Sequence, residues 1–344
     1  MKNITHPTRE FFIGVDISKD TFDAALMISD HRRQGDILKA QFKNNKTGLK
    51  EFDKWLKANR VARNEQAMLV IENTGLYHCL LWDYCSKHEI RIHIGNGAHL
   101  KWSFGIARGK NDQIDSVRLC NYCFKNVDEL KLAPEPDPNI LKLKVLIATR
   151  SRLVKNRGGH QAHLGEINSS LESAIYKMVK KELQLVIDCI EKAIKNIERK
   201  IQDLMKASHE LSTHYKLLLS VPGIGPVTAA YLISCTNNFD THPTGKQLAC
   251  YAGIAPFSKE SGTSIKGKAR VHKMGNKELK RLLYMAVRSA LQHNAEYKAY
   301  YDRKIAEGKP ELFVVNALKN KIISRAAAVI RDSKAYVENY RPAA

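Results

Sequence analysis

The sequence predicts an α/β domain at the N-terminus, followed by a largely helical second half. Up to about residue 132, apolar runs of strand length alternate with amphipathic helical stretches. Beyond that point the apolar residues follow helical spacing for roughly 70 residues. Residues 133–138 (APEPDP) separate the two patterns with three prolines. Each proline lacks an N–H donor and disfavours helix at the preceding residue, so this segment is the clearest domain boundary.

Three strands open the N-terminal domain. Residues 11–17 (FFIGVDI) and 22–28 (FDAALMI) are apolar and separated by the polar SKDT, a pattern typical of a hairpin. The segment DILKAQFKN adds a third strand.

Helices and strands then alternate. Thr47 can cap a helix through LKEFDKWLKANR, and residues 67–72 (AMLVIE) form a short buried strand. The stretch LYHCLLWDYCSKH is helical, IRIHIG is a strand, and a helix with Asp112 and Asp115 near its start follows. This order of elements is that of the ribonuclease H fold.

A heptad pattern lies in the second half of the chain. Apolar residues follow at alternating steps of four and three, at Leu183, Ile187, Ile190, Ile194, Ile197, Ile201 and Leu204. The other positions carry many charges, so the helix is expected to pair with another helix. Self-association between chains, as a dimer or tetramer, is favoured over an internal hairpin, and a buried helix in a bundle is the remaining alternative.

A second globular unit begins near Leu217. In LLLSVPGIGPVTAAYLIS, Gly223 and Gly225 lie between two apolar helical stretches and resemble a helix-hairpin-helix element. Its glycines would let backbone amides approach a DNA phosphate, and a plain tight turn is the alternative. The expected domains are therefore residues 1–132, the helical region 133–212, and residues 213–344.

Charge indicates the class of partner. The 344 residues include 56 Lys and Arg against 35 Asp and Glu, a formal charge of +21. Such a balance favours nucleic acid, with a membrane surface as the weaker alternative. We find no apolar run of about 18 residues and no signal-peptide core at the start, which favours a cytoplasmic protein.

Seven cysteines are scattered along the chain, as expected of reduced thiols. Cys120 and Cys123 form a C-x-x-C motif, but no second pair follows at zinc-ribbon spacing. We therefore expect buried helical cysteines here rather than a metal or redox site.

Four acids form the candidate metal site. Asp16 lies near the end of the first strand, Glu72 closes a strand expected beside it, and Asp112 and Asp115 share one helical face. Four oxygen ligands suit Mg²⁺, or Mn²⁺, in phosphoryl transfer. Each acid alone is more typical of a turn or a helix cap, so the prediction depends on the set.

Hydroxyl groups within a basic segment form a second candidate site. Ser261, Thr263 and Ser264 lie in a short glycine-containing loop. Basic residues surround them, among them Lys266, Lys268, Arg270 and Lys273. A serine could attack a phosphodiester there while cations offset the developing charge, although a solvated charge run is the usual alternative.

Five separated motifs carry a family resemblance, from about residue 11 to residue 290: IGVDISK, IENTGLYH, KNDQIDS, SVPGIG and AGIAPFSKESGTSIKGKAR. Together they resemble the Piv/MooV-type DEDD transposases, the bridge-RNA-guided recombinases of insertion sequences. The resemblance implies a RuvC-like domain whose acids are Asp16, Glu72, Asp112 and Asp115. It also implies a C-terminal transposase domain whose nucleophile is Ser261.

The resemblance has further implications for partners. It implies a guide (bridge) RNA, donor and target DNA, and a homo-oligomer in which one subunit's acids complete a site with another's serine. Tyr77 fits the family pattern and is a candidate DNA contact, with packing at a helix start as the alternative. The function predicted is RNA-guided, Mg²⁺-dependent recombination through a phosphoserine. The alternatives are a RuvC-like nuclease or junction resolvase using water, and a non-catalytic nucleic-acid-binding scaffold.

Overall fold

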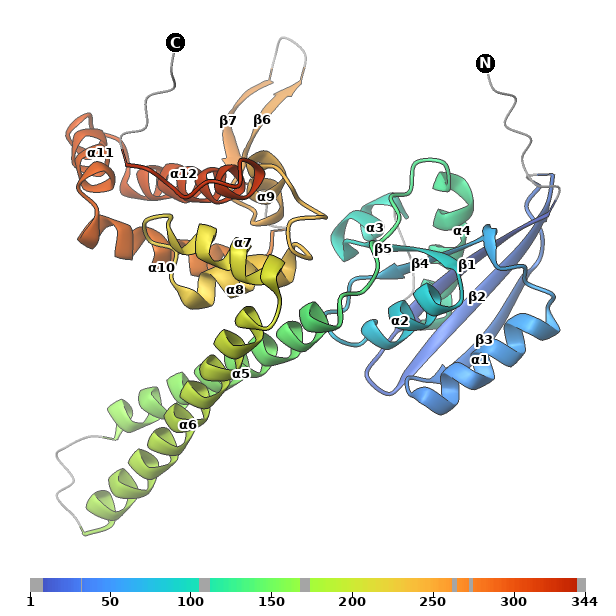
Figure 1. The fold of residues 1–344 in the computed structure, drawn as a ribbon, viewed down its shortest axis with the longest axis horizontal. Coiled ribbons are helices and arrows are strands. Elements are labelled where there is room, and N and C mark those ends of the chain that lie inside the picture. The colour runs from blue at the N-terminus through green and yellow to red at the C-terminus, as the bar shows by residue number, and fades with distance from the viewer. Residues whose placement is uncertain are drawn as a thin grey trace. The chain divides into compact units, whose positions relative to one another are not determined.

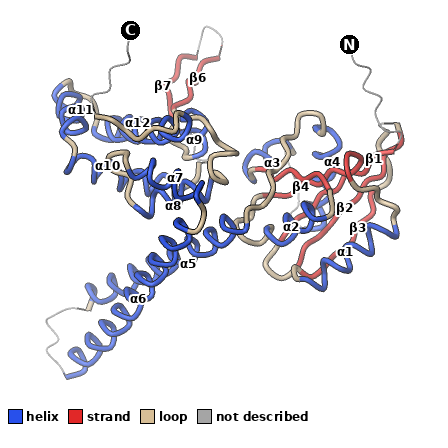
Figure 2. Tube along the Cα trace, in the orientation of Figure 1, coloured by secondary structure: helices blue, strands red, loops and turns tan. Residues whose placement is uncertain are grey.

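A computed structural model describes residues 9–31, 33–104, 112–167, 174–261, 265–271 and 275–338 of the chain. The chain divides into two compact units, Met1–Pro136 and Asp137–Ala344. The division falls inside the proline-rich segment, where the sequence predicts a boundary. Figures 1 and 2 show a sheet with helices in the first unit and mostly helices in the second.

The first unit is built on a five-stranded sheet with strand order β3-β2-β1-β4-β5. Its strands are β1 (Arg9–Ile17), β2 (Thr21–Asp30), β3 (Ile37–Lys43), β4 (Asn64–Glu72) and β5 (Ile90–Gly95). The helices are α1 (Lys46–Ala58), α2 (Cys79–Lys87), α3 (Gly97–Ser103) and α4 (Asp112–Asn126). The first three strands are antiparallel, and β1, β4 and β5 are parallel. This confirms the mixed α/β fold class and the order of elements.

The two faces of the sheet carry different helices. Phe22 of β2 contacts Phe52 of α1 edge to face, with ring centroids 5.5 Å apart. On the opposite face, Phe12 and Met68 pack with Leu119, Cys120 and Cys123 of α4 in one buried cluster. Figure 2 shows the strands in red with these helices in blue. Helices cover both faces because β1 and β4 carry nearly continuous apolar runs, which place buried side chains on both sides of the sheet.

The cap of α1 differs from the prediction. Asn45, and not Thr47, is the N-cap residue, and its side-chain oxygen accepts a hydrogen bond from the Gly48 amide at 2.9 Å. Thr47 lies within the first turn instead. Asn is among the preferred residues at this position, and the helix therefore begins earlier than expected.

The second unit begins with a long helical hairpin, α5 (Pro138–Glu166) and α6 (Ala174–Lys206). The buried members of the heptad seam, Ile187, Ile194 and Ile201, lie on α6, which packs against α5 of the same chain. Arg150 of α5 forms an ion pair with Glu198 of α6 at 2.7 Å. The seam thus pairs with a helix of the same chain, which is the internal hairpin that the sequence analysis ranked below self-association.

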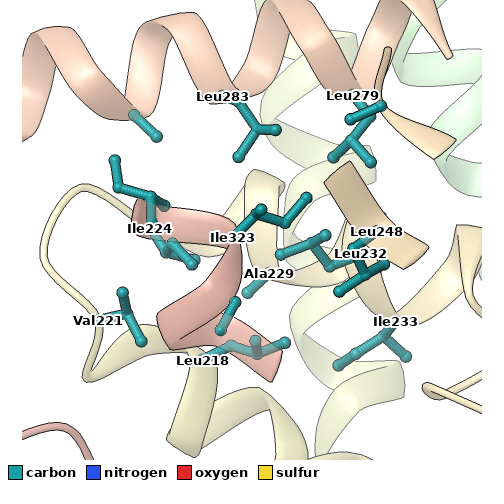
Figure 3. Packing of buried hydrophobic residues seen from close by; sticks show 14 of the residues in the cluster. Leu218, Val221, Ile224, Ala229, Leu232, Ile233, Leu248, Leu279, Leu283 and Ile323 are labelled. Atoms are coloured by element: carbon teal, nitrogen blue, oxygen red, sulfur yellow. The ribbon is translucent and has the colours of Figure 1, made fainter. Parts of the chain in front are cut away.

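The remaining elements form one core. They are α7 (His209–Leu219), α8 (Pro226–Cys235), α9 (Gly245–Tyr251), β6 (Pro256–Ser261), β7 (Ile265–Val271), α10 (Lys277–His293), α11 (Ala295–Ala306) and α12 (Glu311–Arg331). Figure 3 shows the centre of this core, including Leu218, Ile233, Leu283 and Ile323 from four helices. Within the described residues, no helix is both long and apolar enough to cross a bilayer.

Candidate active site

Two of the predicted acids lie at the same edge of the sheet. Asp16 is the penultimate residue of β1, and Glu72 is the last residue of β4. The two strands are parallel, with Val15 opposite Ile71, so Asp16 and Glu72 follow as neighbours in the register. Both side chains are half-buried. Neighbouring residues of parallel strands point to the same face, and the two carboxylates therefore share one face of the sheet.

That face is the one covered by α4. A Cβ on Gly14 would lie 2.0 Å from the Cys120 amide nitrogen and 2.3 Å from the Ser116 carbonyl oxygen. Cys120 also donates to the Phe12 carbonyl at 3.2 Å. From Ser116 onward α4 therefore runs from Gly14 toward Phe12, and its first turn extends the other way, toward Asp16. A glycine is required at this crossing because the two backbones are in contact.

The first turn of α4 carries the other two predicted acids. Asp115 is half-buried and accepts a hydrogen bond from the Arg118 guanidinium at 2.7 Å. Asp112 is the first residue of α4, and its side chain lies outside the described residues. Within the part of the chain that the structure describes, no three His, Cys, Asp or Glu residues lie close enough to hold a metal ion. The oxygen donors present are nevertheless of the type that Mg²⁺ prefers.

Gly97 is a site residue that the sequence patterns did not indicate. It is the first residue of α3, and a Cβ there would lie 1.9 Å from Oε1 of Glu72 and 2.5 Å from its Cδ. The Glu72 carboxylate thus occupies the space that any larger residue at position 97 would fill. The only sequence signal was a glycine in the turn after a strand.

Asp23 is a further acid that the sequence analysis did not select. It is the antiparallel partner of Asp16 in β2, so both side chains lie on the face toward α4. The residue is 3% exposed, and its carboxylate accepts from Nε2 of Gln41 at 3.0 and 3.3 Å. An acid within an apolar strand, FDAALMI, was the available signal.

Tyr77 lies at the same edge of the sheet. Its carbonyl oxygen accepts from Nδ2 of Asn44 at 3.0 Å, and the same amide donates to the Ser18 carbonyl at 2.9 Å. Since Ser18 follows β1, this bond holds the Tyr77 loop beside the end of the strand that carries Asp16. The Tyr77 side chain is 46% exposed, which leaves much of its ring accessible.

The predicted serine loop is a β-hairpin. Ser261 is the last residue of β6 and pairs with Ile265 of β7. Figure 1 shows these two strands extending away from the neighbouring helices of the second unit. Of the hydroxyl residues expected in a short loop, Ser261 is the last residue of a strand, and Thr263 and Ser264 lie outside the described residues. The signal missed was the alternation of side chains in PFSKES and IKGKARV.

The basic residues near Ser261 fall partly within the description. Lys266, Lys268 and Arg270 occupy alternate positions of β7, and Arg270 is exposed. The side chains of Ser261, Lys266 and Lys268 lie outside the described residues, as do Thr263, Ser264 and Lys273 entirely. Of the three hydroxyl residues, the structure places the backbone of Ser261, at the end of β6.

The two glycines of the α7–α8 turn differ in their surroundings. Gly223 has a φ of +88°, and a Cβ there would lie 2.3 Å from the Ala286 carbonyl of α10. Gly223 is therefore needed for packing within the protein as well as for the turn. Gly225 is the N-cap residue of α8, and apart from its chain neighbours no described atom would lie within 4 Å of a Cβ on it. Of the two glycines, Gly225 has the more open surroundings.

The C-x-x-C thiols are buried and free, as predicted for helical core cysteines. Cys123 donates to the Met68 carbonyl at 3.3 Å. Burial raises the pKa of Cys120 to about 12 and that of Cys123 well above its usual value. Both thiols are thus protonated at neutral pH.

Comparison with known proteins identifies both units. Residues 13–167 match a DEDD transposase model of IS110 elements, described as "Transposase", and residues 215–302 match "Transposase IS116/IS110/IS902 family". Pilin gene-inverting proteins of Moraxella bovis and Moraxella lacunata are each 29% identical over 94% of this chain and 97% of their own length. The insertion element IS110 43.6 kDa protein of Streptomyces coelicolor is 37% identical over 43% of this chain and 35% of its own.

Proposed function

Because the chain belongs to the IS110/IS116 family of DEDD transposases and carries both of its domains, we propose that it cuts and rejoins DNA through a phosphoserine formed on Ser261. Four acids, Asp16, Glu72, Asp112 and Asp115, would hold the divalent metal that this reaction uses. The observation that carries the proposal is the neighbouring placement of Asp16 and Glu72 beneath the first turn of α4.

The acids fit a hard divalent cation, Mg²⁺ or Mn²⁺. They provide only oxygen ligands, they come from two adjacent strand ends and one helix turn, and Gly97 leaves the Glu72 carboxylate its space. When bound, such an ion neutralises the charge on the scissile phosphate and on the oxygens entering and leaving it. The Arg118 guanidinium neutralises the charge of Asp115 and orients its carboxylate through their ion pair.

Ser261 is the proposed nucleophile. Its Oγ forms a bond to phosphorus, the phosphorus–oxygen bond to the deoxyribose breaks, and the hydroxyl proton of the serine is exchanged for one taken up by the leaving oxygen. Rejoining reverses these steps with a new deoxyribose hydroxyl. No external energy source is needed, because the phosphoserine retains the ester bond. The full-length similarity to proteins named for gene inversion supports this coupling of cleavage with rejoining.

Basic residues would hold the DNA around Ser261. Lys266, Lys268, Arg270 and Lys273 are the proposed phosphate contacts, and a formal charge of +21 supports a polyanionic partner. Gly225, with no neighbouring atom in the way, is the better candidate for a backbone contact than Gly223. Tyr77, exposed beside the end of β1, would contact the DNA that lies against the acids.

Covalent trapping tests the nucleophile. Ser261→Ala should abolish a protein–DNA adduct that survives denaturant, whereas Thr263→Ala and Ser264→Ala should retain it. If Ser261→Ala keeps the adduct and one of the others loses it, the assignment is wrong. If the wild-type protein releases free 3′-hydroxyl and 5′-phosphate ends with no adduct, water is the nucleophile and the protein acts as a metal-dependent nuclease.

A guide RNA and an oligomer, dimer or tetramer, complete the proposal. Both follow from the family resemblance, and the basic composition is compatible with RNA. Purifying the protein without nuclease and sequencing the co-purified RNA tests the first point. One defined RNA species supports guidance, and a random sample of cellular RNA contradicts it. Mixing Asp16→Asn protein with Ser261→Ala protein tests a site shared between subunits, because only a shared site regains activity in the mixture.

A further inference from the structure

Polar residues form one continuous row across the sheet. Gln41 of β3 pairs with Asp23 of β2, and Asp23 pairs with Asp16 of β1. Glu72 of β4 follows Asp16 on the next strand, by the register of Val15 with Ile71. The row directly inside it, from Ala25 and Gly14 to Val70, is apolar and packs beneath α4. The row therefore marks the point where the hydrophobic core ends and the site begins.

Asp23 is the buried member of this row. It is 3% exposed, less than any of the described candidate metal ligands, which are half-buried. Its hydrogen-bond donor is the neutral amide of Gln41, at 3.0 and 3.3 Å from the two carboxylate oxygens. Within the described residues, Asp23 forms no ion pair with a lysine or arginine. A buried carboxylate normally has a cationic partner or contacts a metal ion, because the loss of hydration is otherwise uncompensated.

An acid elsewhere in the same unit shows the usual arrangement. Asp53 of α1 accepts from Arg63 at 2.6 Å, from Lys57 at 2.7 Å and from the Tyr84 hydroxyl at 2.7 Å. Although burial acts to raise its pKa, these hydrogen bonds and charges hold the pKa below its usual value. Asp53 thus has its countercharge within the protein. Gln41 fixes the orientation of Asp23, but no lysine or arginine in the described part of the chain pairs with it, and its cross-strand neighbour Asp16 is also an acid.

From this we propose that Asp23 is a positioning residue for the metal site, whose buried charge, oriented by Gln41, strengthens cation binding by Asp16 and Glu72. This inference rests on the proposed metal dependence. The cation would relieve the repulsion between two neighbouring carboxylates, so its binding is favoured by both. Gln41 donates hydrogen bonds to both oxygens of Asp23. These bonds hold the Asp23 carboxylate in a second layer behind the metal ligands, where it does not contact the cation itself. Residues in such a layer typically alter metal affinity by 10- to 100-fold.

The test is a titration of the protein with MnCl₂, without DNA, followed by thermal unfolding and by electron paramagnetic resonance of the free ion. We expect Asp23→Asn to raise the Mn²⁺ concentration at half-saturation by about 10-fold or more. The metal-free variant should unfold at the same temperature as the wild type or higher, because asparagine keeps an acceptor for Gln41 and removes the repulsion. An unchanged half-saturation concentration would overturn the inference.

A second variant tests the charge of Asp23 without replacing a buried residue. Gln41 lies on the exposed edge strand, and Gln41→Lys would place a cation beside Asp23. If the charge of Asp23 matters, this variant also weakens Mn²⁺ binding while stabilising the metal-free protein. If Asp23 serves only the fold, Gln41→Lys leaves the half-saturation concentration unchanged. It therefore decides the question even if Asp23→Asn does not fold.

Controls separate this inference from the proposed function. Asp53→Asn removes a carboxylate that already has its countercharge, and should lower the unfolding temperature without changing Mn²⁺ binding. Asp16→Asn should abolish binding. If the wild-type protein binds no Mn²⁺, the proposed metal site itself fails. If the wild type binds Mn²⁺ and both Asp23→Asn and Gln41→Lys bind it equally well, only the role of Asp23 is refuted.

Discussion

Replacement of Gly97 by alanine should inactivate the enzyme while leaving its fold intact. The added Cβ would lie 1.9 Å from Oε1 of Glu72, whereas ordinary contacts between heavy atoms are about 3.5 Å. The carboxylate oxygen must therefore move by about 1.5 Å. The atoms nearest to the added Cβ belong to the flexible side chain of Glu72, which can rotate away. We expect the free energy of unfolding to change by less than about 1 kcal/mol, below the usual range for overpacking of a rigid core.

The loss of activity should be much larger. A misplacement of about 1 Å in a catalytic group can reduce a rate by about 100-fold. The assay is recombination of a plasmid bearing the element's ends, scored by the new DNA junctions, with circular dichroism to measure thermal unfolding. Gly158→Ala in α5 is the matched control and should stay active, since outside its own helix no described atom would lie within 4 Å of the added Cβ. Full activity of a folded Gly97→Ala protein would refute the proposed role of the Glu72 position.

Three other predictions concern stability and reactivity. Gly14→Ala should destabilise the protein by about 1–3 kcal/mol or more in thermal unfolding, because its Cβ would meet the backbone of α4; an unchanged melting temperature would contradict this packing. Burial acts to raise the pKa of Glu296, but hydrogen bonds from Lys321, Arg325 and Tyr336 lower it to about 2. The pKa of Glu296 is lower in the folded protein than its ordinary value of 4.5. The ionised side chain therefore stabilises the fold above pH 4.5, and this stabilisation is lost as the pH falls toward 2. Glu296→Gln should therefore be less stable than the wild type at pH 7 and equally stable near pH 2, measured by denaturant unfolding. Exposed Cys250 should react with a thiol reagent in the native protein and Cys120 only after unfolding; fast labelling of Cys120 would show that it is accessible.

Much of the N-terminal domain could be predicted because its sequence patterns are local. Apolar runs of strand length, the polar break SKDT and the proline-rich segment each indicate an element without reference to distant residues. The positions of Asp16 and Glu72 at strand ends follow from the same patterns. The N-cap of α1 was missed because Asn45 and Thr47 are both good capping residues, and the choice depends on where β3 ends.

The partner of the heptad seam and the serine hairpin were harder to predict. A heptad pattern shows that a helix packs against another helix. It does not distinguish a helix of the same chain from one of a second chain. In this chain α5 provides the partner. The strands beside Ser261 give only a weak signal, the side-chain alternation in IKGKARV, because these segments are polar and β6 and β7 pair with each other.

The sequence by itself provided the residues of the proposed chemistry: four acids as candidate ligands of a divalent metal, a serine among cations as the candidate nucleophile, and a strongly basic chain. These depend on residue type and order, which are complete in the sequence. The tertiary structure decided which residues adjoin them. Asp23 became a neighbour of Asp16 through the register of two antiparallel strands, and Gly97 became a neighbour of Glu72 through the packing of α3. Register and packing arise from contacts between distant segments, and no local pattern specifies them.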